Sequence, residues 1–113
     1  MSLRRGDLVT VVAKGPYTSK PRPALVIQAS ETLPYRDSVT VCLLTADLID
    51  APLFRVRIEP APGNGLKRAS DLMADKITTV PRTLLSAKPF GRLGAADLER
   101  VEAALRFWLG LEG

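Results

Sequence analysis

Only one stretch of this 113-residue chain has the pattern of a long helix, and it lies near the C-terminal end. Within residues 95–109, apolar side chains recur at three- and four-residue intervals, at Leu98, Val101, Leu105 and Trp108. This spacing places them on one face of an amphipathic helix, and Gly110 is suited to end it. The rest of the chain must therefore supply most of the fold without another long helix.

Before this helix, the chain consists of short apolar or alternating segments divided by turn residues. Five of them predict strands: residues 8–13, 24–28, 38–45, 53–58 and 68–80. The fifth segment reads as one strand, or as two that are interrupted near residues 74–76. Residues 81–86 predict one short helical turn, since proline favours the first position of a helix. We expect a single domain over residues 1–113, a small, mostly antiparallel, barrel-like sheet, with the helix covering its open side or a partner's surface.

The fourth segment alternates cleanly between two kinds of residue. Phe54, Val56 and Ile58 fall on one side, and Arg55 and Arg57 fall on the other. We expect the first side to face the core and the second to be basic or solvated.

The absence of histidine limits the chemistry that the chain can perform. It excludes Ser-His-Asp and Cys-His catalysis and most zinc enzymes. The single cysteine, Cys42, excludes intramolecular disulfides, and its position in the middle of a strand predicts an inert core residue. No metal-ligand spacing occurs, so we expect no cofactor.

The net charge of +4 and a sequence pI near 9.6 favour anionic partners, either nucleic acid or an acidic polypeptide. A mild surplus of basic residues that only aids solubility is the alternative. No secretory signal and no apolar run long enough to cross a bilayer is visible, which indicates the cytoplasm.

Arg22 lies between two prolines, immediately before the second strand segment. Pro21 and Pro23 each fix their own φ and favour an extended conformation for the residue before them, so the backbone that carries Arg22 is stiff. A guanidinium held in this way loses less entropy when it binds a phosphate. From these residues alone, a solvated arginine at the end of a loop is the alternative.

Two further polar residues lie beside strands. Thr45 ends the third strand segment, and its hydroxyl would face the same site as Arg22 if the two strands are neighbours; a local hydrogen bond at a strand end is the alternative. Asp75 lies between hydrophobic segments, where an aspartate commonly caps a turn. The loop over residues 14–20 combines Tyr17 with lysines, as a binder of single-stranded nucleic acid would need, although packing or solvent exposure would explain a single tyrosine equally well.

Five sequence blocks in a fixed order resemble the MazF/PemK family of toxin endoribonucleases. They are Arg-Gly-Asp-Leu-Val at 5–9, Arg-Pro-Ala-Leu-Val-Ile-Gln at 22–28, Val-Thr-Val-Cys-Leu-Leu-Thr at 39–45, Asp-Lys-Ile-Thr-Thr-Val at 75–80, and Gly-Arg-Leu at 91–93 before a helix that ends in Leu-Gly-Leu. The resemblance spans almost the entire chain. It implies an SH3-like barrel of the plasmid-toxin type (CcdB/MazF/PemK) with an appended helix. It also implies a homodimeric toxin of a type II toxin–antitoxin module that cleaves single-stranded RNA without a metal.

The resemblance also implies roles for individual residues. Arg22 matches the family's arginine before Pro-Ala or Pro-Val, Thr45 matches its strand-end threonine or serine, and Asp75 matches an aspartate implicated as the base in some members. This chain departs from the pattern at Met73, where the members with that aspartate have arginine, and at Thr78, where many relatives have arginine. It also lacks the histidine that some carry in the first loop.

The implied reaction is attack of an RNA 2′-OH on the adjacent phosphorus, giving a 2′,3′-cyclic phosphate and a free 5′-OH. Arg22 would stabilise the charge on the phosphorane, Thr45 would hold a phosphate oxygen, and Asp75 or Lys20 would remove the proton. The RNA-binding residues would be Lys14, Tyr17, Ser19, Lys20 and Lys76. The expected partners are single-stranded RNA and a cognate antitoxin whose acidic segment competes for the same groove.

Two alternatives would use the same fold without cleaving RNA. One is a gyrase poison of the CcdB type, against which the pair of Arg22 and Thr45 argues. The other is an inactive RNA-binding homologue, which the missing arginines at positions 73 and 78 favour.

Overall fold

The computed structural model describes residues 3–12 and 21–111. The elements in chain order are β1 (Asp7–Val11), β2 (Arg22–Val26), the 3₁₀ helix η1 (Ser30–Tyr35), β3 (Ser38–Thr45), β4 (Arg55–Ile58), β5 (Ser70–Pro81), the 3₁₀ turn η2 (Arg82–Leu84), β6 (Gly91–Arg92) and α1 (Ala95–Leu109). The predicted helix is confirmed at both ends. Gly110 follows it in the left-handed conformation, and its N–H bonds to carbonyls of the last turn.

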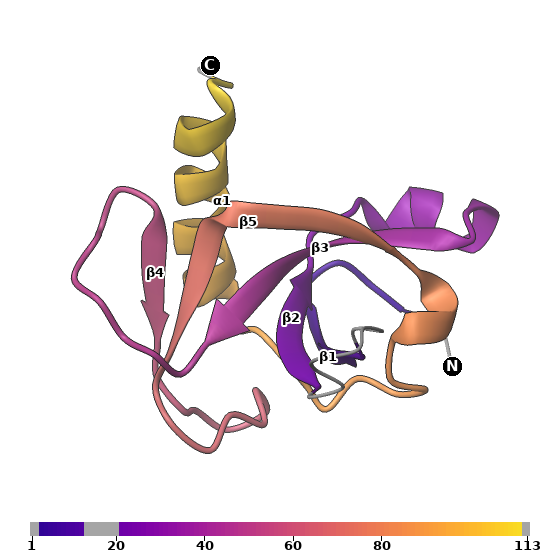
Figure 1. The fold of residues 1–113 in the computed structure, drawn as a ribbon, viewed down its shortest axis with the longest axis horizontal. Coiled ribbons are helices and arrows are strands. Elements are labelled where there is room, and N and C mark those ends of the chain that lie inside the picture. The colour runs from indigo at the N-terminus through magenta and orange to yellow at the C-terminus, as the bar shows by residue number, and fades with distance from the viewer. Residues whose placement is uncertain (1–2, 13–20, 112–113) are drawn as a thin grey trace, which may run out of the picture.

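The strands form one antiparallel sheet in the order β4-β5-β3-β2-β1-β6. The sheet curls, and α1 lies against its β4–β5 end, as Figure 1 shows. The mostly β fold with a C-terminal helix is therefore as predicted.

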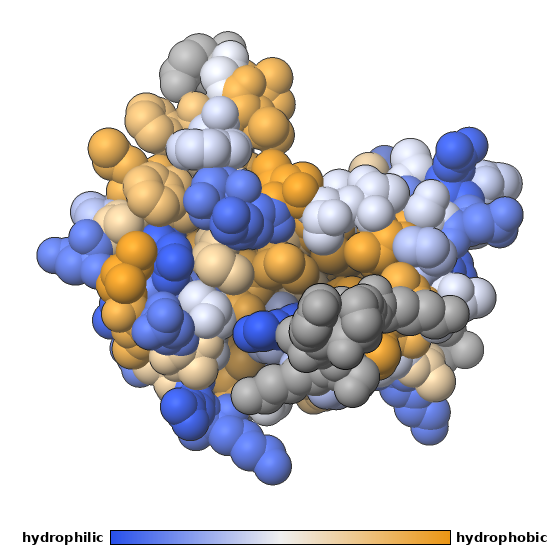
Figure 2. Space-filling view, in the orientation of Figure 1, coloured by the Kyte–Doolittle hydropathy of each residue, from blue (hydrophilic) through white to orange (hydrophobic). Residues whose placement is uncertain are grey.

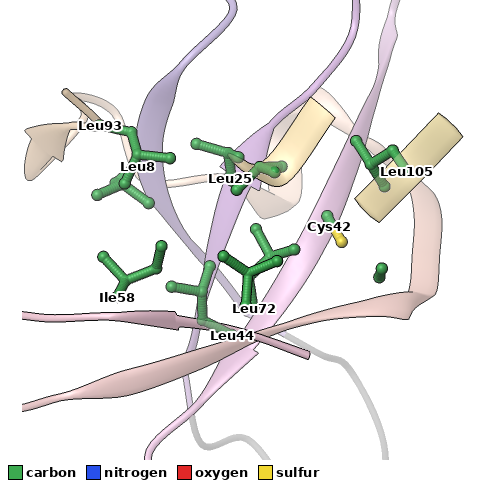
Figure 3. Close-up of a cluster of buried hydrophobic side chains, with 11 residues drawn as sticks. Leu8, Leu25, Cys42, Leu44, Ile58, Leu72, Leu93 and Leu105 are labelled. Carbon is green, nitrogen blue, oxygen red and sulfur yellow. The ribbon is translucent and has the colours of Figure 1, made fainter. Parts of the chain in front are cut away.

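Each face of the sheet packs its own core. The helix-side core lies between the sheet and α1, where Leu8, Leu25, Cys42, Leu44, Ile58, Leu72, Leu93 and Leu105 meet (Figure 3). The second core lies on the opposite face and contains Val9, Val11, Ala24, Val26, Leu33, Val39 and Val41. Because side chains alternate along a strand, successive residues of β2 supply both cores, which is why residues 24–26 are all buried.

The long strand β5 takes the first of the two forms that the sequence predicted. It is one continuous element rather than two, but it contains an irregularity at the predicted point of interruption. Cys42 of β3 pairs with Ile77, whereas Leu44, only two residues on, pairs with Leu72. The extra residues of β5 bulge out of the ladder, and a bulge re-aims the side chains that it carries.

Two short elements were not predicted. Residues 30–35 form η1, whose Leu33 is buried. The two-residue strand β6 pairs with β1, and its Gly91 lies so close to the turn at Asn64 that an added Cβ would be 2.1 Å from that residue's carbonyl oxygen. Neither element has a periodic sequence pattern. Each is held by contacts with residues distant in sequence, which local spacing does not reveal.

Candidate functional site

Arg22 and Thr45 face the same side of the sheet. Antiparallel pairing of β2 with β3 matches Ala24 with Leu43, and continuing this register by two residues sets Arg22 opposite Thr45. Ala24 and Leu43 belong to the second core, so the side chains two residues away lie on the same face, opposite α1. The sequence predicted that Arg22 and Thr45 would face one site if their strands were neighbours, and β2 and β3 are neighbours.

These side chains line a hollow of about 310 Å³ in the surface. Its lining residues come from β2, β3, β4, β5 and the connection between β3 and β4: Arg22, Leu43, Leu44, Thr45, Asp47, Arg55, Met73 and Lys76. We call this the Arg22–Thr45 hollow. It brings three cationic side chains together with a single carboxylate, which favours an anionic ligand.

Thr45 is held in place by a turn that follows β3. Its Oγ1 accepts a hydrogen bond from the backbone N–H of Asp47 at 3.1 Å. This is the local strand-end hydrogen bond that the sequence allowed as an alternative. The hydroxyl keeps its own proton for a second bond, so the local bond orients Thr45 without preventing contact with a ligand.

Asp75 lies in the bulge of β5, next to Lys76 but not among the residues that line the hollow. Its Oδ1 is buried and has no hydrogen-bond partner among the described residues. The nearby thiol of Cys42 is also buried; burial, together with the charge of Asp75, raises the pKa of Cys42 to about 12. Cys42 is thus a protonated core residue, as predicted.

The predicted RNA-binding residues are only partly described. Lys76 is exposed and lines the hollow. Lys14, Tyr17, Ser19 and Lys20 lie outside the described residues.

Sequence reasoning missed an ionic cluster beside the hollow. Asp71 of β5 is 1% exposed and faces the same side as Thr45, with which it pairs. Its carboxylate accepts hydrogen bonds from Arg57 Nε at 2.5 Å and from the Ile49 N–H at 3.0 Å, and Arg55 Nη1 lies 3.4 Å away. The alternation of β4 did indicate a basic face, but its acidic partner is fourteen to sixteen residues away in sequence.

The hydrogen bonds and charges of this cluster act against the effect of burial. Burial alone would raise the pKa of Asp71. The bonds from Arg57 and Ile49 and the charges of Arg57 and Arg55 outweigh it, so the pKa of Asp71 lies below its ordinary value. The Asp71 hydrogen bond likewise raises the pKa of Arg57.

Among the described residues there is no group of three or more side chains suited to hold a metal ion, and no helix there has the length and hydropathy needed to span a membrane.

Comparison with known proteins gives a consistent result over the length of the chain. Residues 4–109 match the family model described as PemK-like, MazF-like toxin of type II toxin–antitoxin system. A probable endoribonuclease MazF from Mycolicibacterium smegmatis is 49% identical over 111 residues, which cover 98% of this chain and all of that protein.

Solved structures share the fold at lower sequence identity. A MazE–MazF crystal structure from Deinococcus radiodurans superimposes with a TM-score of 0.82 at 21% identity, covering 99% of both chains. An endoribonuclease from a mycobacterial species in complex with its cognate antitoxin has a TM-score of 0.74 at 20% identity, covering 99% of this chain and 97% of that one.

Proposed function

The chain belongs to the family of PemK-like, MazF-like toxins of type II toxin–antitoxin systems, and we propose that it is an endoribonuclease that cleaves single-stranded RNA in the Arg22–Thr45 hollow. The observation that carries this proposal is the position of Arg22 and Thr45, which face one another across two paired strands and line one cationic hollow. An arginine and a hydroxyl in this arrangement suit a phosphodiester, whose oxygens accept hydrogen bonds from both.

The proposed reaction breaks the P–O5′ bond without a metal. The RNA 2′ oxygen attacks the adjacent phosphorus, its proton leaves, and a 2′,3′-cyclic phosphate forms while the 5′ oxygen departs and is protonated. Arg22 stabilises the charge that develops on the phosphorane, and Thr45 donates a hydrogen bond that holds the phosphate in line. The interactions of Arg22 and Thr45 with the phosphate both strengthen as negative charge develops in the transition state.

Proton removal from the 2′-OH needs a base, because a guanidinium with a pKa above about 12 is a poor one. We propose Asp75 for this step. Its support is the buried carboxylate oxygen that lacks a partner among the described residues, one residue from Lys76 at the hollow. Access to the 2′ oxygen would require the Asp75 side chain to turn toward the hollow.

The experiment is digestion of a long single-stranded RNA in EDTA, followed by mapping of the fragment ends. The wild-type protein should give discrete cuts whose downstream fragments carry a 5′-OH that a kinase labels directly. Arg22→Ala should lose cleavage and keep its fold. Arg106→Ala is the matched control, since Arg106 is exposed on the last turn of α1, against the other face of the sheet.

Full activity of Arg22→Ala, or no cleavage by folded wild-type protein free of antitoxin, would overturn the proposal. RNA binding without cleavage would indicate the non-cleaving homologue instead. In the same assay, Asp75→Asn should suppress cleavage if Asp75 is the base.

The partners that we propose follow from charge and family. A cognate antitoxin would place an acidic segment in the cationic hollow and so compete with RNA. The protein would act in the cytoplasm, where its RNA substrate is found. We also propose a homodimer, supported by the apolar surface at the C-terminal end of α1, where Phe107, Trp108, Leu109 and Leu111 are exposed (Figure 2).

A further inference from the structure

Arg55 contributes a second guanidinium to the Arg22–Thr45 hollow. It begins β4, pairs with Met73 of β5, and lines the hollow together with Arg22. Because β5 and β3 separate β4 from β2, the two arginines approach the hollow from opposite sides. With strands about 4.8 Å apart, and because the sheet curls, their backbones are separated by at most about 14 Å.

Contacts with the protein hold the Arg55 guanidinium in position. Its Nη1 donates to the carbonyl oxygen of Asp47 at 3.2 Å and lies 3.4 Å from Asp71 Oδ2. Only 16% of the Arg55 side chain is exposed. An arginine held in this way has already lost much of the freedom that a surface arginine would lose on binding.

The charge of Arg55 is nevertheless incompletely neutralised. One carboxylate, Asp71, serves both arginines of β4, and its shorter contact is with Arg57, at 2.5 Å compared with 3.4 Å for Arg55. Within the described part of the chain, the guanidinium of Arg55 forms hydrogen bonds through Nη1 alone, and its buried Nε has no partner. The guanidinium can therefore still stabilise an anion.

We propose that Arg55 binds a phosphate next to the one at Arg22, so that the hollow holds two successive phosphates of one RNA strand. This inference rests on the proposed function. Because the two guanidiniums enter the hollow from opposite sides, each can contact a different phosphate of one bound strand. Arg55 would thus position the strand so that the scissile phosphate meets Arg22 and Thr45.

The test measures how salt weakens binding to a 2′-O-methylated single-stranded oligonucleotide of mixed sequence, which cannot be cleaved. Each phosphate contact on a single strand contributes about 0.7 to the slope of log K against log salt. Arg55→Gln should weaken binding several-fold at low salt and reduce the slope by about 0.7. Arg106→Gln makes the same change in net charge, but Arg106 lies on α1, which packs against the other face of the sheet. This variant should keep the wild-type slope.

A wild-type slope for Arg55→Gln, with the variant folded, would overturn the inference. The failure of this inference can be separated from the failure of the proposed function. If the wild-type protein cleaves RNA but Arg55→Gln binds with the wild-type salt slope, only the role of Arg55 is refuted. Wild-type protein that neither cleaves nor binds RNA refutes both.

A second measurement uses the wild-type protein and so does not depend on how a variant folds. Bound oligonucleotide should slow the modification of Arg55 by phenylglyoxal, mapped by mass spectrometry, and leave Arg106 unaffected. Equal rates at Arg55 with and without the oligonucleotide would contradict the proposal.

Discussion

At the scale of single residues, the candidate site depends on side chains that are oriented before a ligand arrives. Thr45 accepts a hydrogen bond from the Asp47 N–H, and Arg22 is carried by a backbone that Pro21 and Pro23 stiffen. A hydroxyl positioned in this way need not reorganise during the reaction, which makes it more effective at stabilising developing charge.

Thr45 allows a sharp test of its hydroxyl. Thr45→Val keeps the shape of the side chain but removes the oxygen, and we expect the single-turnover cleavage rate to fall about 100-fold or more, as for loss of one transition-state hydrogen bond. Thr45→Ser keeps the hydroxyl and its bond from Asp47, so it should retain most of the activity. Equal rates for the valine and serine variants would show that the hydroxyl takes no part in the reaction.

At the scale of elements, Asp71 ties three segments together. Its carboxylate joins β5 to both arginines of β4 and to the backbone of Ile49 in the connection that precedes β4. Asp47, whose carbonyl oxygen accepts a bond from Arg55, belongs to the same connection. This buried anion therefore shapes one side of the hollow.

Removing this charge should destabilise the fold in a pH-dependent way. Asp71→Asn removes the buried charge that pairs with Arg55 and Arg57. We expect the free energy of unfolding, measured with urea near pH 7, to fall by about 1–3 kcal/mol. Because the pKa of Asp71 is lower in the folded state than its ordinary value of 3.8, its stabilising effect is complete above that value and is lost as the pH falls through the folded-state pKa.

The difference between wild type and Asp71→Asn should accordingly shrink as the pH falls from about the ordinary value of 3.8 through the lower, folded-state pKa. Asp97→Asn is the control, since Asp97 forms a more exposed pair with Arg100 along α1 and should cost less than about 1 kcal/mol. A difference that stays constant with pH would show that the charge of Asp71 is not the stabilising feature.

At the scale of the whole molecule, the curled sheet places helix packing and the candidate site on different faces. One face packs against α1 and builds the helix-side core, and the other face carries the Arg22–Thr45 hollow beside the second core. The apolar end of α1 projects beyond the sheet, at the top of Figures 1 and 2. A partner chain could cover that surface and leave the hollow accessible.

The proposed homodimer is tested by light scattering after size-exclusion chromatography. The wild-type protein should have twice the 12.2 kDa mass of one chain. Phe107→Asp puts a charge on the exposed apolar end of α1 and should shift the population toward the single-chain mass. Tyr35→Asp alters an exposed aromatic residue on η1 and should remain dimeric. A single-chain mass for the wild-type protein would exclude the dimer under those conditions.

Much of the fold was predictable because it is encoded locally. The 3.6-residue periodicity of residues 95–109 needs no distant contact to be recognised, and the helix forms with those bounds. The alternation in Leu53–Ile58 likewise predicted the two faces of β4, although the strand begins at Arg55 because residues 52–54 turn. Residues without periodicity, such as those of η1 and β6, offered no comparable signal.

The sequence by itself determined where the main strands lie along the chain, and it determined the helix and its bounds. It also placed Arg22 and Thr45 at strand ends. These features follow from local spacing, proline geometry and turn residues. Only the tertiary structure decided that β2 and β3 are neighbours, that β5 bulges at residues 73–76, and that Arg55 and Asp71 meet beside the hollow. The physical reason is that strand order and register depend on contacts between residues far apart in the chain, and a shift of one residue would turn each of these side chains to the other face.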